Sequence, residues 1–145
     1  MQIALDEARA AARRGEVPVG AVVTDPGGAV LARAGNEVEA RGDPSAHAEL
    51  LALREAARLA GGKRLAGCTL HVTLEPCAMC AAAASLFRVA RVVFGAYDPK
   101  SGGVEHGARV FAHPQCHHAP EVVGGVREVE AAALLRDFFA GLRQP

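Results

Sequence analysis

Two short motifs carry side chains that together could perform chemistry. The first is His47-Ala48-Glu49, and the second, about thirty residues later, is Pro76-Cys77-Ala78-Met79-Cys80. They offer one imidazole, two thiols and one carboxylate. Zinc takes nitrogen and sulfur ligands in a tetrahedral arrangement, and a catalytic zinc keeps one position for water. We therefore expect His47, Cys77 and Cys80 to hold zinc, with Glu49 as the acid and base of a hydrolytic reaction.

The spacing within each motif separates the metal ligands from the proton carrier. Residues three apart lie on one face of a helix, so Cys77 and Cys80 at a helix start can bind one ion together. The positive end of that helix favours thiolates over thiols. We expect His47 to approach from the start of a second helix. The two-residue offset then directs Glu49 toward a water instead of the metal.

A Cys-x-x-Cys pair alone is also typical of a structural zinc half-site or a redox pair. A structural zinc needs a fourth protein ligand, but Cys68, His71 and Cys116 show no paired spacing with one another. A zinc-stabilised binding module without catalysis remains an alternative. The additional carboxylate of Glu49 argues against this alternative, because a structural zinc site does not need a carboxylate that is not a ligand.

Hydrophobic periodicity and turn signals predict the elements that must position these motifs. The expected helices are 3–14, a second from about 43–45 to 61–62, 77–88 and 129–142. The expected strands are 17–24, 29–36, 68–74, 91–97 and 121–126. The second helix should carry His47 and Glu49 in its first turn. This order predicts an α/β fold, a three-layer α/β/α sandwich with a mixed central sheet of about five strands and parallel crossover units.

Length, composition and charge limit the classes of protein to which the chain can belong. With 145 residues and 50% hydrophobic content, the chain is expected to form a single domain over residues 1–145. No apolar run approaches the roughly 20 residues of a membrane span, and no signal peptide is recognisable, so we expect a cytoplasmic protein without a membrane partner. Sixteen basic and sixteen acidic residues argue against strong non-specific binding of nucleic acid. A local basic patch remains open, formed by Arg54, Arg58, Lys63 and Arg64.

The motifs and their flanks resemble the bacterial tRNA-specific adenosine deaminases, the TadA family of the cytidine deaminase-like superfamily. His-x-Glu followed by Pro-Cys-x-x-Cys is the signature of zinc-dependent nucleobase deaminases. The flanking blocks narrow the resemblance to the tRNA enzymes. These blocks are Gly15 to Val22, Asn36, Asp43 to Glu49, Thr73 to Cys80 and Arg91 to Asp98.

The resemblance implies an activity, a cofactor and partners. It implies that Zn²⁺ and Glu49 convert adenosine to inosine at the wobble position of a tRNA anticodon loop, and that the protein is a homodimer. It further implies that Asn36, the backbone near Ala48 and Asp98 contact the substrate. Phe138 and Phe139 match an aromatic pair that packs near the RNA in this family.

The chain departs from the family pattern in places that would face nucleic acid. The departures are Leu86-Phe87, Val104 to Gly107 and Pro114 to Ala119. Together with the neutral net charge, they keep open a second function, deamination of a free base or nucleoside such as guanine, cytosine or cytidine. A second metal site is the weakest alternative, because its residues are irregularly spaced: His113, Cys116, His117 and His118.

Overall fold

A mixed five-stranded sheet forms the centre of the computed structural model, which describes residues 1–143. Its strands, in the order β2-β1-β3-β4-β5, are β1 (Gly20–Thr24), β2 (Val30–Gly35), β3 (Thr69–Leu74), β4 (Arg91–Ala96) and β5 (Glu121–Val123). Strand β1 pairs antiparallel with β2 and β3, whereas β4 pairs parallel with β3 and β5. The prediction of a mixed sheet of about five strands is confirmed.

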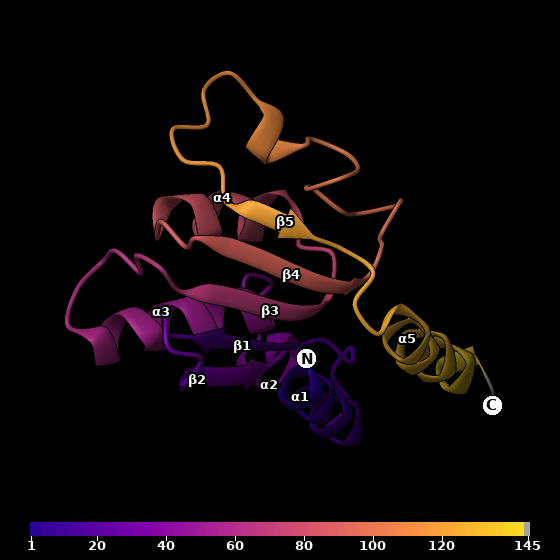
Figure 1. Cartoon of the computed structure of the whole chain (residues 1–145). Coiled ribbons are helices and arrows are strands. Elements are labelled where there is room, and N and C mark those ends of the chain that lie inside the picture. The colour runs from indigo at the N-terminus through magenta and orange to yellow at the C-terminus, as the bar shows by residue number, and fades with distance from the viewer. Residues whose placement is uncertain (144–145) are drawn as a thin grey trace.

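Helices cover both faces of this sheet (Figure 1). Helices α3 (Ala48–Ala60) and α4 (Ala78–Leu86) lie on one face, and α1 (Gln2–Arg13) and α5 (Glu128–Arg143) lie on the other. The predicted three-layer α/β/α sandwich is therefore confirmed. None of the helices described is long and apolar enough to cross a membrane.

The main hydrophobic core fills the space between the sheet and the α3 and α4 layer. Leu53 of α3, Leu70 of β3 and Phe94 of β4 are fully buried there, and small alanines of α4 pack against them. Such burial is the dominant favourable term in folding. On the opposite face, Gly20 lets α1 approach β1 closely, because a Cβ there would collide with the backbone of Ala4.

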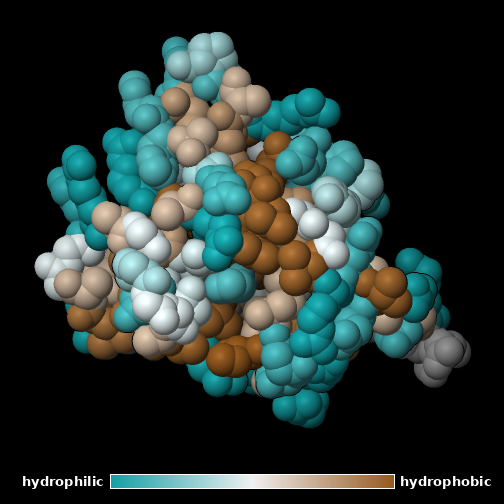
Figure 2. Space-filling view, viewed as in Figure 1, coloured by the Kyte–Doolittle hydropathy of each residue, from teal (hydrophilic) through white to brown (hydrophobic). Residues whose placement is uncertain are grey.

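The face that carries α1 and α5 is only partly covered. Figure 2 shows hydrophobic side chains gathered near the middle of this face and hydrophilic side chains over most of its periphery. A hollow of about 620 Å³ remains here, lined among others by Thr24, His71 and Arg91. The Thr24 hydroxyl lies 3.2 Å from Nε2 of His71. This hollow lies outside the two predicted metal motifs.

The two helices that carry the metal motifs start later in the chain than the sequence pattern predicts. The expected helix start at 43–45 is wrong, because the Asp43 carboxylate accepts hydrogen bonds from the N–H and hydroxyl of Ser45 and holds a turn. Helix α3 starts at Ala48, and His47 is its extended N-cap residue. Helix α4 likewise starts at Ala78, with Cys77 as its N-cap residue. Both ligands therefore stand at helix N-caps.

The structure also contains elements that the sequence pattern did not predict. A short helix, α2 (Val38–Arg41), follows β2, and a 3₁₀ turn, η1 (Val110–Ala112), lies in the long connection before β5. The largest differences in strand boundaries are in β1 and β5. Strand β1 starts at Gly20 instead of residue 17, and β5 ends at Val123, before a Gly-Gly pair.

Candidate active site and metal centre

The two predicted motifs meet at one edge of the sheet. Strands β3 and β4 both end at this edge, and the chain leaves β3 through Glu75 and Pro76 into Cys77. Helices α3 and α4 both begin here, so their positive ends converge. His47 and Cys77 come from the two N-caps, and Cys80 from the first turn of α4. The prediction that the ligands come from the starts of two helices is therefore confirmed.

The three ligand side chains have the geometry of a zinc site. Nδ1 of His47 lies 3.6 Å from Sγ of Cys77 and 3.4 Å from Sγ of Cys80. Tetrahedral zinc with bonds of about 2.0 Å to nitrogen and about 2.3 Å to sulfur separates a nitrogen ligand from a sulfur ligand by about 3.5 Å. Within residues 1–143, this is the one group of three or more His, Cys, Asp or Glu residues found close enough to hold a metal.

The expectation of a possible second metal site at residues 113–118 gains no support. The Sγ of Cys116 lies 3.5 Å from the Ser85 hydroxyl, and the ring of His118 contacts the carbonyl oxygen of Val89. These contacts tie the segment to the end of α4. They occupy two of the side chains that such a site would need.

The thiols and the imidazole shift one another's pKa. The Cys80 thiol and the His47 imidazole lower the pKa of Cys77 to about 4. Cys77 and burial raise the pKa of Cys80, and the hydrogen bond with Cys77 raises that of His47. One thiolate is therefore favoured before any metal binds. Metal binding has to displace the proton of the Cys80 thiol.

Glu49 lies in the first turn of α3, close to the triad but outside the set of ligand atoms. Its side chain is buried, with 4% of the residue exposed, and burial raises the pKa of Glu49 to about 7. A carboxyl group with a pKa near the working pH can both take up and release a proton. Glu49 therefore fits the predicted role of proton carrier.

A cavity of about 690 Å³ opens onto these residues. His47, Glu49 and Cys77 line it together with apolar side chains of the strand ends, among them Val19 and Leu74. Phe138 and Phe139 of α5 line the same cavity. The size and the mixed lining suit a small aromatic group with a few polar contacts.

The predicted substrate contacts reach the cavity in different ways. Asn36, 8% exposed, lines it, and its side-chain oxygen accepts a hydrogen bond from the Ala48 N–H at 2.8 Å. The side-chain NH₂ of Asn36 is then the group left for a ligand. Ala48 itself is fully buried, and its N–H is already donated to Asn36. Asp98 also lines the cavity, but its carboxylate accepts from the N–H groups of Lys100 and Ser101.

Two buried residues that line this cavity were missed in the sequence analysis. Glu16 and Glu75 are buried glutamates, 1% and 2% exposed, and both line the cavity. Glutamate is almost never fully buried unless it is paired. Their signal in the sequence is weak, because Glu16 only follows a helix end and Glu75 only precedes the Pro-Cys motif.

Comparison with known proteins agrees with this geometry. Residues 1–96 match the family described as the cytidine and deoxycytidylate deaminase zinc-binding region. A tRNA-specific adenosine deaminase of Agrobacterium fabrum is 53% identical over 140 residues, which cover 96% of this chain and 91% of that protein. The chain belongs to the tRNA-specific adenosine deaminase family. The family resemblance, zinc as cofactor and the ligand triad are thereby confirmed.

Two solved structures have a similar fold. One, from structural studies of A-to-I editing by tRNA:A34 deaminases, is 51% identical with a TM-score of 0.91, over 93% of this chain and 97% of that one. The guanine deaminase of Nitrosomonas europaea is 25% identical with a TM-score of 0.78, over 96% of this chain and 82% of that one. The likeness is closer to the adenosine deaminase family than to the guanine enzyme.

Proposed function

We propose that this chain is a zinc-dependent hydrolytic deaminase that converts adenosine to inosine at the wobble position of tRNA. The observation that carries this proposal is the His47, Cys77 and Cys80 triad with Glu49 beside it at a cavity. The chain carries this centre in a fold shared with tRNA:A34 deaminases at 51% identity. An anticodon loop presents its bases unpaired, so little unstacking energy is needed to bring one into a pocket.

The reaction adds water at the amine-bearing ring carbon and releases ammonia. Zinc bound by the triad supplies a Lewis acid that makes water nucleophilic at neutral pH. Glu49 takes a proton from the attacking water and delivers it to the ring nitrogen next to that carbon. It then takes the second proton from the hydroxyl group added to that carbon and gives it to the amino group. The carbon–nitrogen bond breaks, ammonia leaves, and the hydroxyl oxygen becomes the carbonyl oxygen of inosine. The raised pKa of Glu49, about 7, suits both transfers.

Asn36 supplies the main contact with the base in this proposal. Its NH₂ group donates to an acceptor atom on the base edge, while the Ala48 N–H holds its oxygen in place. Asp98 contributes by fixing the turn at the cavity rim. Phe138 and Phe139, packed edge to face with ring centroids 5.4 Å apart, provide an apolar wall.

A substrate panel tests the proposal. Ammonia release is measured on an anticodon stem-loop, adenosine, guanine, cytosine and cytidine, and turnover is expected on the stem-loop. The alternative, a deaminase of a free base or nucleoside, draws on the neutral charge of the chain and its likeness to a guanine deaminase. Turnover of a free base with none on the RNA would replace the leading proposal with that alternative.

The resemblance further supports a homodimer acting in the cytoplasm, where tRNA is available, with residues 1–145 as one deaminase domain. An apolar surface on α4 suits such an association, because Leu86 is 76% exposed beside a hollow of about 300 Å³. Sedimentation should give twice the chain mass of 15.0 kDa. A monomeric mass would remove the dimer from the proposal and leave the deaminase chemistry untouched.

A further inference from the structure

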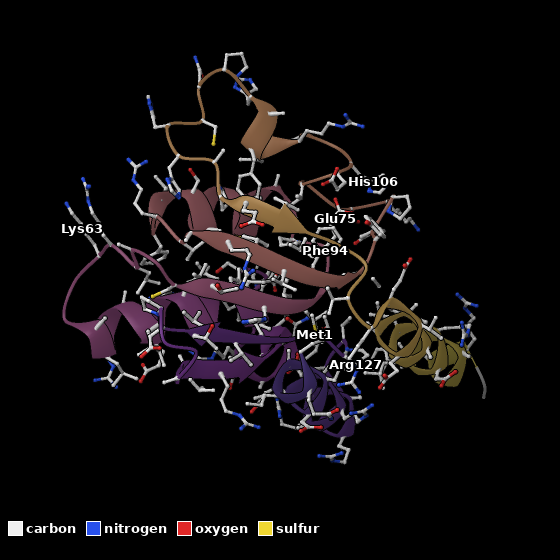
Figure 3. The ribbon with its side chains drawn as sticks, in the orientation of Figure 1. Met1, Lys63, Glu75, Phe94, His106 and Arg127 are labelled. Atoms are coloured by element: carbon white, nitrogen blue, oxygen red, sulfur yellow. The ribbon has the colours of Figure 1, made fainter. Side chains whose placement is uncertain are left out.

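Glu75 is a buried carboxylate that the proposed reaction does not use. It follows β3 and precedes Pro76 and Cys77, and its side chain is 0% exposed. Figure 3 shows Glu75 and His106 close together, where the segment after β4 folds back over the sheet edge. Residues 98–106, called here the wall segment, form that part of the chain.

Five hydrogen bonds from the wall segment converge on the Glu75 carboxylate. The N–H of Asp98 donates to one oxygen at 3.0 Å. The N–H groups of Val104, Glu105 and His106 donate to the other at 3.2, 2.9 and 3.1 Å. The ring Nδ1 of His106 lies 2.8 Å from the first oxygen. Burial opposes the charged carboxylate, but these donors outweigh it and hold the pKa of Glu75 below its usual value.

The wall segment is pressed against the metal-bearing helix. The N–H of Gly103 donates to the Pro76 carbonyl at 2.8 Å, and a Cβ on Gly103 would collide with the backbone of Ala78. Asp98 and Ser101 of this segment line the cavity. Glu75 therefore joins the end of β3, the start of α4 and one side of the cavity through a single carboxylate.

Glu16 is a second buried carboxylate that accepts backbone hydrogen bonds at the cavity, but it has fewer of them than Glu75. Its carboxylate accepts from the N–H groups of Glu39 and Ala40 and so holds α2, from which Val38 and Glu39 line the cavity. Within residues 1–143, both hydrogen bonds to the Glu16 carboxylate come from backbone N–H groups, whereas the His106 ring also reaches Glu75.

We propose that Glu75, which is hydrogen-bonded to His106, is a positioning residue. It holds the wall segment in place, so that this segment forms one side of the substrate cavity. It sets how tightly the nucleotide is held and leaves proton transfer by Glu49 unaffected. This inference rests on the proposed function for the identity of the substrate. The position of the wall segment itself does not depend on which substrate is used.

Hydrogen exchange tests the positioning without any substrate. In the zinc-loaded protein, Glu75→Gln places an NH₂ group among N–H donors, so the amides of residues 104–106 should exchange at least about tenfold faster. His106→Ala keeps the backbone bonds and should give a smaller increase in the same amides. His117→Ala, an exposed histidine of the neighbouring connection, is the matched control and should change nothing. Unchanged exchange in both test variants, or an equal increase throughout α3, would overturn the proposal.

Kinetics separate positioning from a merely structural role. On the anticodon stem-loop, Glu75→Gln and His106→Ala should raise KM by about tenfold and about threefold, with kcat within about twofold of the parent. Zinc content should stay at one equivalent, and Glu75→Asp, which keeps both acceptor oxygens, should recover part of the lost affinity. A fall in kcat with unchanged KM, or loss of zinc, would refute positioning. If the parent does not turn over the stem-loop, the proposed function fails, but the exchange experiment still decides on Glu75.

Discussion

The zinc centre and the connection from Asp98 to Pro120 are built on different principles. The two regions meet where β4 ends, and the connection then runs to the opposite edge of the sheet, where the parallel strand β5 begins. At the zinc centre, three ligands come from two helix starts and lie within motifs of three and five residues. The connection holds only a three-residue 3₁₀ turn. Its shape depends on residues far away in the chain, namely Glu75, Ser85 and Val89. Local patterns therefore carry the chemistry, and long-range hydrogen bonds carry the surface around it.

The difference also separates what is rigidly required from what can vary. A zinc ligand admits few replacements, because nitrogen and sulfur donors must meet at fixed distances. A connection held by hydrogen bonds admits many sequences, provided that buried donors and acceptors are paired.

The largest effect is expected at the zinc centre itself. Cys80→Ser removes a buried thiolate ligand, so zinc content should fall from one equivalent to below about a tenth, since metal affinity and folding are coupled. The melting temperature should fall with it, and turnover should disappear. Metal analysis and thermal unfolding measure both. A variant that kept a full equivalent of zinc would contradict the proposed coordination.

Glu49→Gln should separate chemistry from metal binding at the same centre. Without the proton carrier, kcat should fall by about 10²- to 10⁴-fold, the range typical of general acid and base groups. Zinc content and the melting temperature should stay near those of the parent. Loss of zinc would instead make Glu49 a ligand.

Asn36→Asp tests the two hydrogen-bonding roles of Asn36 inside the cavity separately. The aspartate keeps an oxygen for the Ala48 N–H but loses the NH₂ donor, so KM should rise by about tenfold, as for one lost hydrogen bond. Asn36→Ala loses both, and should also lower the free energy of unfolding by about 1–3 kcal/mol by leaving a buried N–H unpaired. Equal stability in the two variants would show that the bond to Ala48 contributes nothing.

In the connection, a smaller effect on stability alone is expected. The Nε2–H of His118 donates to the Val89 carbonyl at 2.7 Å. His118→Ala should lower the free energy of unfolding by about 1 kcal/mol, the net value of one such bond. Zinc content should not change, and His117→Ala should match the parent in both. Loss of zinc in His118→Ala would show that the two regions are more tightly coupled than their construction indicates.

The smallest effect is a pH dependence that lies outside both regions. Burial, together with nearby positive charge that includes Arg91, lowers the pKa of His71. The unfolded chain therefore binds this proton more readily, so the free energy of unfolding should fall as pH drops below about 6.5. His71→Gln should weaken that fall in chemical unfolding measured between pH 7 and 5. An identical pH profile in the variant would show that His71 does not contribute.

The sequence alone determined the chemistry and the layer order. The residue types and spacing of His47, Glu49, Cys77 and Cys80 restrict the metal and the reaction, since few side chains bind zinc and few spacings bring them together. Hydrophobic periodicity and turn residues located the five strands and four long helices, because both signals are local. The start of the helix that carries Glu49 was predicted wrongly. At residue 43, the side chain of an aspartate favoured a turn over the helix that the pattern indicated.

Only the tertiary structure decided how the cavity is walled. Whether Asn36 turns its oxygen to Ala48, and where the wall segment lies, depends on donors and acceptors that are distant in sequence. Glu75 looks like an ordinary acidic residue in the sequence, and it becomes a fully buried acceptor only when four backbone N–H groups of a later segment close around it. Burial makes each of these groups require a partner, and burial is a property of the folded chain.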